Sequence, residues 1–101
     1  MRFNGLSDAE AERLACLAEE CGETIKAIGK ILRHGYESYD PTSRKDHPPS
    51  NKEDLEREIG DVAAIIAMMA KAGDIDAGAI DGYRAEKLTR VGRYLHHQES
   101  K

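Results

Sequence analysis

The chain has 101 residues, of which 40% are hydrophobic and 34% are charged, so it is long enough for one domain and too short for a second. Its net charge of −4 argues against duplex nucleic acid as a partner, and no apolar run approaches the roughly 20 residues that a membrane span requires. A domain this small buries only about two-thirds of its unfolded surface, so we expect a second copy of the chain or a bound ion to stabilise it.

The N-terminal segment and the two cysteines indicate the cellular compartment. Met1–Ser7 lacks the apolar stretch of a secretory signal. Cys16 and Cys21 lie five positions apart, about 140° around a helix, where they cannot readily bond to each other. We therefore expect a cytoplasmic protein with both thiols free.

The first predicted helix follows Ser7. Segment 7–10 (SDAE) has the pattern of a capping box, in which Ser7 caps the first turn and Glu10 reaches back to it. Apolar residues then recur every three or four positions as far as about Arg33, which is the period of a helix, and Gly35 is a suitable stop. This apolar stripe consists of Leu14, Leu17, Cys21, Ile25, Ile28 and Leu32.

A loop of about 18 residues, 34–51, comes next. It contains three prolines, which do not fit the interior of a regular helix, and two tyrosines. A loop of this length is unusual in a compact domain, so we expect a flexible segment, either a functional flap or a disordered one.

The second predicted helix runs from about Lys52 to Ala72. It begins with another capping box, in which Ser50 is the cap and Glu53 reaches back. Residues 62–70 (VAAIIAMMA) are all uncharged, and a helix that is apolar on every side must be covered on every side. Two other helices of one chain could hardly achieve this, so the run predicts a homo-oligomeric bundle.

The third predicted helix runs from Ile75 or Asp76 to Leu95, and no segment has a convincing strand pattern. We therefore predict an all-α fold, with a three-helix protomer that forms a four-helix-bundle-like core as a homodimer or homotetramer. The residues of the third helix expected to face inward are Ile80, Tyr83, Leu88, Val91 and Leu95.

Paired carboxylates on the first two helices predict a metal site. Glu20 with Glu23, and Glu58 with Asp61, are three positions apart, so each pair lies on one helix face. One such pair is also typical of a solvated helix face, but both pairs adjoin apolar stripes. If the helices pack antiparallel, four carboxylates face one another and repel unless a cation lies between them. Oxygen ligands favour Mg²⁺ or Mn²⁺ over zinc.

The pattern Glu19-Glu20-x-x-Glu23 followed by Glu58-x-x-Asp61 resembles that of the MazG-type all-α nucleoside triphosphate pyrophosphohydrolases. The resemblance extends over about residues 14–95. It implies that the chain, 1–101, is a single MazG-like domain. It also implies hydrolysis of a (deoxy)nucleoside triphosphate to the monophosphate and pyrophosphate by a metal-activated water, with Mg²⁺ as the cofactor and Mn²⁺ as a possible substitute.

The resemblance also assigns roles to the carboxylates. Glu20, Glu23, Glu58 and Asp61 correspond to the acidic residues that hold magnesium in the family. The additional leading acid is Glu19, which would orient or deprotonate the attacking water. Either Glu19 or Glu23 would be the general base, and the sequence does not decide between them.

Substrate contacts are expected from two further parts of the chain. Family members place basic residues after the second motif against the phosphates, and the best matches are Lys87 and Arg90. The 34 residues between Glu23 and Glu58 (24–57) are more than is usual in the family, and the excess is the proline-containing loop near the expected position of the base.

Individual residues of that loop allow two interpretations each. Tyr36 and Tyr39 could stack on a nucleobase or simply anchor the loop. His34 could contact a phosphate, but the end of a helix also favours a histidine electrostatically.

Other functions are also compatible with parts of this pattern. A non-catalytic helical dimer would keep the bundle, and a phosphoribosyl-ATP pyrophosphohydrolase-like activity would use a related scaffold. A di-iron bundle needs Glu-x-x-His pairs, and no histidine has a glutamate three positions before it. We expect no membrane and no nucleic-acid partner, and location in the host cytoplasm if a phage encodes the protein.

Overall fold

The computed structural model describes residues 3–98, and this part of the chain is all-α, as predicted. The elements are α1 (Asp8–His34), α2 (Asn51–Ala72), α3 (Ala77–Arg90) and a short 3₁₀-helix, η1 (Val91–Tyr94). Within the described residues there is no strand, only an isolated antiparallel bridge between Tyr39 and Ser50 in the loop.

Both predicted capping boxes are present. The Ser7 hydroxyl accepts a hydrogen bond from the Glu10 backbone N–H at 3.1 Å, and the Glu10 carboxylate accepts one from the Ser7 backbone N–H at 2.8 Å. At the start of α2, the Ser50 hydroxyl accepts a hydrogen bond from the Glu53 backbone N–H at 3.1 Å. The Glu53 carboxylate accepts one from the Ser50 backbone N–H, also at 3.1 Å. These bonds satisfy amide groups that have no partner inside the helix, which is why α1 and α2 begin where they do.

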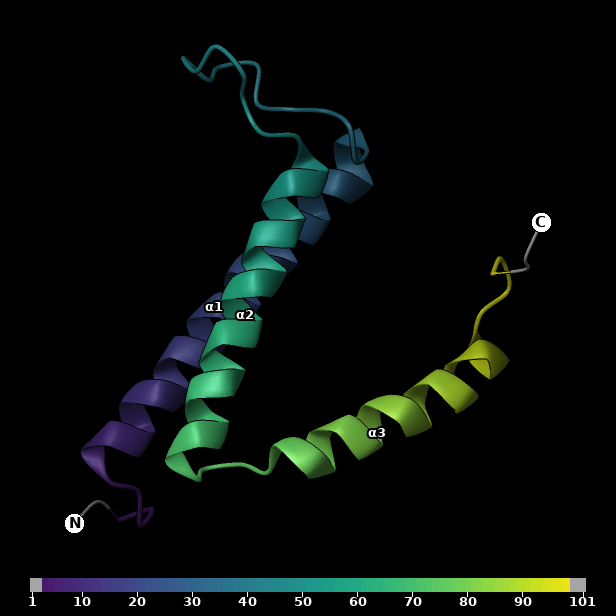
Figure 1. Cartoon of the computed structure of the whole chain (residues 1–101). Coiled ribbons are helices and arrows are strands. Elements are labelled where there is room, and N and C mark those ends of the chain that lie inside the picture. Colours follow the sequence, from purple (N-terminus) through teal and green to yellow (C-terminus); the bar gives the residue numbers. More distant parts are fainter. Residues whose placement is uncertain (1–2, 99–101) are drawn as a thin grey trace.

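α1 and α2 form an antiparallel hairpin, in which the two helices lie side by side along most of their length (Figure 1). The buried hydrophobic residues within the described part of the chain are Ala27 of α1 and Met69 of α2. The core of the single chain is therefore thin and lies between these two helices.

The loop from residue 35 to residue 50 is pinned at its base. Gly35 ends α1 with φ +88°, a conformation that a side chain would strain. The backbone N–H groups of Asn51 and Lys52 donate to the carbonyls of Ser38 and Tyr36, at 2.7 and 2.9 Å. The start of α2 therefore holds the beginning of the loop against the end of α1.

α3 extends away from the hairpin (Figure 1), and every residue from 77 to 90 is exposed. The expectation that this helix packs inward is therefore wrong for the single chain: Ile80, Tyr83, Leu88 and Leu95 are exposed and Val91 is half-buried.

The α-helix also ends at Arg90, not at Leu95, and the chain continues as the 3₁₀ turn η1. Gly92 lies in that turn, and glycine weakens an α-helix.

The chain is extended and leaves much apolar surface uncovered. Its radius of gyration is 17.5 Å, whereas a compact domain of about 100 residues has a radius near 13 Å. Large exposed apolar side chains occur on all three helices, for example Ile25 of α1 (69% exposed), Met68 of α2 (49%) and Leu88 of α3 (66%). None of the described helices has the length and hydropathy needed to cross a bilayer.

Candidate metal centre and adjoining groove

Three carboxylates meet where the middle of α1 faces α2. Glu20 comes from α1, and Glu58 and Asp61 come from one face of α2, as their spacing of three residues predicts. One oxygen from each of them lies within 4.8 Å of the others. We call these three residues the carboxylate cluster.

The cluster carries an excess of negative charge. Partial burial raises the pKa of Glu20, and the negative charges of Asp61 and Glu58, followed by those of Glu19 and Glu23, raise it further. Among the described residues, Arg57 brings a positive charge near the cluster, with its Nη2 atom 4.0 Å from the Glu58 carboxylate. A cation placed among these oxygens would relieve the repulsion that makes Glu20 harder to ionise.

The donor set fits a hard divalent cation. Mg²⁺ and Mn²⁺ prefer oxygen ligands, and Mg²⁺ is commonly held by one or two carboxylates together with waters and substrate phosphates. The cluster offers three carboxylates from two helices, of which Glu20 and Glu58 are half-buried and Asp61 is exposed. An exposed side leaves room for a substrate.

The other acidic residues expected at the site lie at its edge. Glu23 is exposed, about one turn along α1 from Glu20, and it lines a groove together with Glu58. Glu19 precedes Glu20 and is also exposed. Neither residue is among the three whose oxygens meet.

The expected phosphate contacts lie elsewhere in the single chain. Lys87 and Arg90 are exposed residues near the end of α3, and α3 leads away from the hairpin that carries the carboxylate cluster (Figure 1). The structure does not bring them to the cluster within one chain.

The structure reveals a groove that the sequence analysis did not identify. A cavity of about 210 Å³ between α1 and α2 begins at Glu58 and Glu23 and is lined further along by Lys26, Lys30 and Arg57. Glu23, Lys26 and Lys30 are three and four positions apart, the spacing of one helix face. That spacing is the signal that the sequence offers, although lysines at such positions usually belong to a solvated helix face.

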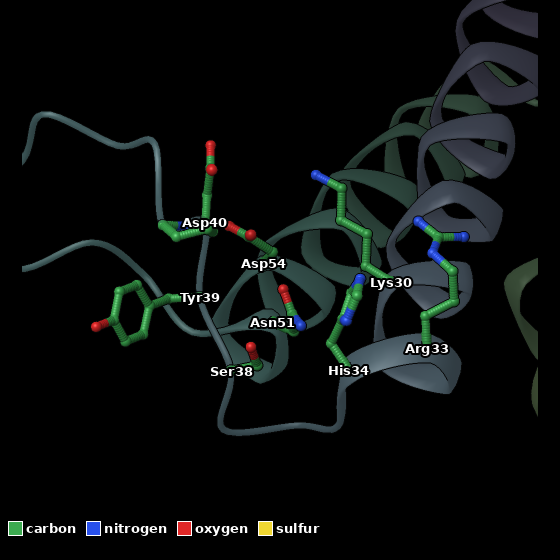
Figure 2. Close-up of a pocket in the computed structure, with 9 residues that line it drawn as sticks. Lys30, Arg33, His34, Ser38, Tyr39, Asp40, Asn51 and Asp54 are labelled. Carbon is green, nitrogen blue, oxygen red and sulfur yellow. The ribbon is translucent and has the colours of Figure 1, made fainter.

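A second cavity, of about 300 Å³, lies at the loop end of the hairpin (Figure 2), and we call it the loop pocket. Its polar lining includes Lys30, Arg33, His34, Asn51 and Asp54.

Two loop residues considered for base stacking have different positions. Tyr39 lines the loop pocket, although Figure 2 shows its ring directed away from the other side chains drawn there. Tyr36 instead lies beside a separate, more apolar hollow with Leu55 and Ile59.

Comparison with known proteins gives one match. The family model described as the MazG nucleotide pyrophosphohydrolase domain matches residues 9–93, a range that includes the carboxylate cluster, the groove and the loop pocket. No curated protein and no solved structure matches the chain.

Proposed function

Because the chain belongs to the MazG nucleotide pyrophosphohydrolase domain family, we propose that it hydrolyses a (deoxy)nucleoside triphosphate between the α and β phosphates. The products would be a nucleoside monophosphate and pyrophosphate. The observation that carries this proposal is the carboxylate cluster, in which oxygens of Glu20, Glu58 and Asp61, from two helices, lie within 4.8 Å of one another.

The metal would be Mg²⁺, with Mn²⁺ as an alternative. Glu20, Glu58 and Asp61 would hold it, and Glu23 would join them by a change of rotamer, which its exposure permits. A bound divalent cation neutralises phosphate charge and lowers the pKa of a water at neutral pH.

The remaining roles belong to exposed residues around the cluster. Glu19 or Glu23 would accept the proton of the attacking water, since both adjoin Glu20 and are open to solvent. Lys87 and Arg90 would offset the charge of the departing pyrophosphate. In the single chain both lie on α3, away from the cluster. This role therefore requires either that α3 moves towards the hairpin or that another copy of the chain supplies the two residues.

A homodimer or homotetramer would answer that requirement and cover the apolar surface. Ile25, Ile28 and Leu32 of α1 and Ile59 and Met68 of α2 are all exposed although large and apolar. Ile25, Ile28 and Leu32 lie three and four positions apart and so share one face of α1. An exposed apolar face of this kind usually marks a protein interface. Two hairpins joined through these faces would form a four-helix-bundle-like core.

A nucleotide panel tests the proposed function. The purified chain is incubated with Mg²⁺ and each common ribo- and deoxynucleoside triphosphate, together with a phosphoribosylated ATP, and monophosphate and pyrophosphate are quantified. We expect both products in equal amounts and no orthophosphate. Asp61→Asn should abolish turnover, whereas Asp81→Asn, which changes an exposed carboxylate on α3, should not. Absence of pyrophosphate with every nucleotide would reject the proposal and favour a non-catalytic helical dimer.

A further inference from the structure

The groove and the loop pocket adjoin each other. Both are lined by Lys30, Asn51 and Asp54, and the groove reaches Glu58 of the carboxylate cluster at its other end. At 1.5 Å per residue, Lys30 lies about 15 Å along α1 from Glu20, and Asn51 lies about 10 Å along α2 from Glu58. A nucleotide whose phosphates lie at the cluster could therefore extend its sugar and base along the groove towards the loop.

Asn51 is the most deeply placed polar residue in this pocket. It is 6% exposed and is the buried polar residue of the described chain. Its side-chain nitrogen donates to the Gly35 carbonyl at 3.1 Å, and its backbone N–H donates to the Ser38 carbonyl at 2.7 Å. These two bonds connect the start of α2 to both the end of α1 and the loop, so the Asn51 side chain has little freedom to rotate.

The bond to Gly35 also fixes which way the amide faces. A carbonyl can only accept a hydrogen bond, so the amide nitrogen must lie on the Gly35 side and the oxygen on the other. Figure 2 shows the Asn51 oxygen directed towards the other side chains that line the pocket. No described residue donates a hydrogen bond to this oxygen. No buried side-chain nitrogen or oxygen of the described residues lacks a hydrogen-bond partner, so this oxygen is accessible from the pocket although the residue as a whole is buried. An accessible acceptor that is held in place favours a ligand that brings a donor.

Lys30, Arg33 and His34 are the pocket residues that complement that acceptor, while Asp40 and Asp54 add carboxylates to the lining. Lys30 supplies a cation, and its charge is one of the causes that lower the pKa of Asp40, after the hydrogen bonds from Thr42. His34 lies beside Lys30 in Figure 2. The pocket thus pairs a fixed acceptor with nearby donors, which suits a planar ligand that has an amino group next to a ring acceptor.

We propose that the loop pocket holds the base of the nucleotide, that the Asn51 oxygen accepts a hydrogen bond from an amino group of that base, and that Lys30 donates to a neighbouring acceptor atom on the ring. This inference rests on the proposed function, because it takes the nucleotide's phosphates to lie at the carboxylate cluster. Amino-bearing bases would be preferred over bases with a carbonyl at the same position, since a second acceptor would face the Asn51 oxygen and leave it unpaired.

The cytosine and uracil deoxynucleoside triphosphates form the best matched pair of substrates. They differ only in that cytosine has an amino group where uracil has a carbonyl oxygen. We expect kcat/KM to be at least about tenfold higher for the cytosine nucleotide, the size expected for one well-placed hydrogen bond to a buried group. Lys30→Met keeps the aliphatic stem and should raise KM about tenfold with little effect on kcat, because it removes a contact to the base only. Lys71→Met, in the last turn of α2, serves as the control and should leave KM unchanged.

Binding measured without turnover gives a second readout. In ¹H–¹⁵N spectra of the metal-free chain, cytidine monophosphate should shift the side-chain amide signals of Asn51 and the backbone signals of Lys30 and His34. Uridine monophosphate should shift them less at equal concentration. Shifts confined to residues near the carboxylate cluster would overturn the assignment.

The two proposals fail differently. Pyrophosphate release with equal kcat/KM for both bases, and with no effect of Lys30→Met, would overturn the base site and leave the enzymatic function standing. Base-selective shifts at Asn51 without any pyrophosphate release would overturn the enzymatic function and support the pocket.

Discussion

Arg13 and Asp74 join the first turns of α1 to the end of α2 through a bidentate ion pair. The Arg13 Nε and Nη2 atoms donate to the two oxygens of Asp74 at 2.6 and 3.0 Å, and the two side chains are only 20% and 12% exposed. The hydrogen bond from Arg13 lowers the pKa of Asp74, and the same bond raises the pKa of Arg13. The pair closes the end of the hairpin from which α3 departs.

Asp74→Asn should therefore lower the melting temperature by a few degrees at neutral pH. Because the folded-state pKa of Asp74 is lowered, its contribution is present above the ordinary carboxyl range and is lost as pH falls through the lowered value. Thermal unfolding of both proteins between pH 7 and pH 3 should show a difference that shrinks towards the acid end. A difference that does not change with pH would contradict the role assigned to this pair.

Glu20→Gln should reduce pyrophosphate release by roughly a hundredfold or more, because losing one carboxylate would weaken the proposed metal site. Circular dichroism should still show a helical protein, since Glu20 takes no part in a cap. Glu12→Gln changes an exposed acid on the same helix and is the matched control. Full magnesium-dependent turnover by Glu20→Gln would remove the metal assignment.

Metal binding should become more stabilising as pH rises. The pKa of Glu20 is raised, so the metal-free fold loses stability as pH rises from the ordinary carboxyl range through the raised value. A divalent cation replaces the proton and removes this loss. The increase in melting temperature caused by Mg²⁺ should therefore grow over that interval, as measured by scanning calorimetry with and without chelator. An increase that is the same at every pH would argue against a cation at Glu20.

The two capping serines provide a matched pair. Ser7→Ala and Ser50→Ala should each cost about 1 kcal/mol of unfolding free energy, measured by urea titration, because each leaves helix-end amides unsatisfied. Only Ser50→Ala loosens the start of α2 next to Asn51, so only this variant should also raise KM for the nucleotide. Equal KM values would mean that the cap does not support the loop pocket.

Ile25→Glu should shift the protein from an oligomer to a monomer in sedimentation experiments at micromolar concentration. Ile25 is 69% exposed on α1, and a charge there would be costly to bury in an interface. Glu12→Lys, which reverses an exposed charge on the same helix, should leave the oligomer intact. A wild-type chain that sediments as a monomer would contradict the proposed bundle.

Local signals predicted most of the secondary structure. The two capping boxes fixed the starts of α1 and α2 because they depend on residues three positions apart. The spacing of Glu58 and Asp61 likewise predicted that these two carboxylates share a face, and antiparallel packing brought Glu20 opposite them.

Long-range relationships escaped the sequence analysis. The apolar residues of α3 suggested an inward face, but whether a helix folds back depends on packing partners that no local pattern specifies. The loop pocket depends on the bond from Asn51 to Gly35, which lie 16 residues apart across the proline-containing segment. Nothing in the spacing of those two residues indicates that they meet.

The same bond has a consequence for how the chain can vary. Since Asn51 clamps the root of the connection between α1 and α2, the outer residues 40–47 can lengthen, shorten or change composition without altering how the two helices align. Substitutions in the outer loop would then change ligand preference while Glu20, Glu58 and Asp61 keep their relative positions. The bonds at Asn51 thus separate the carboxylate cluster from changes in the outer part of the loop.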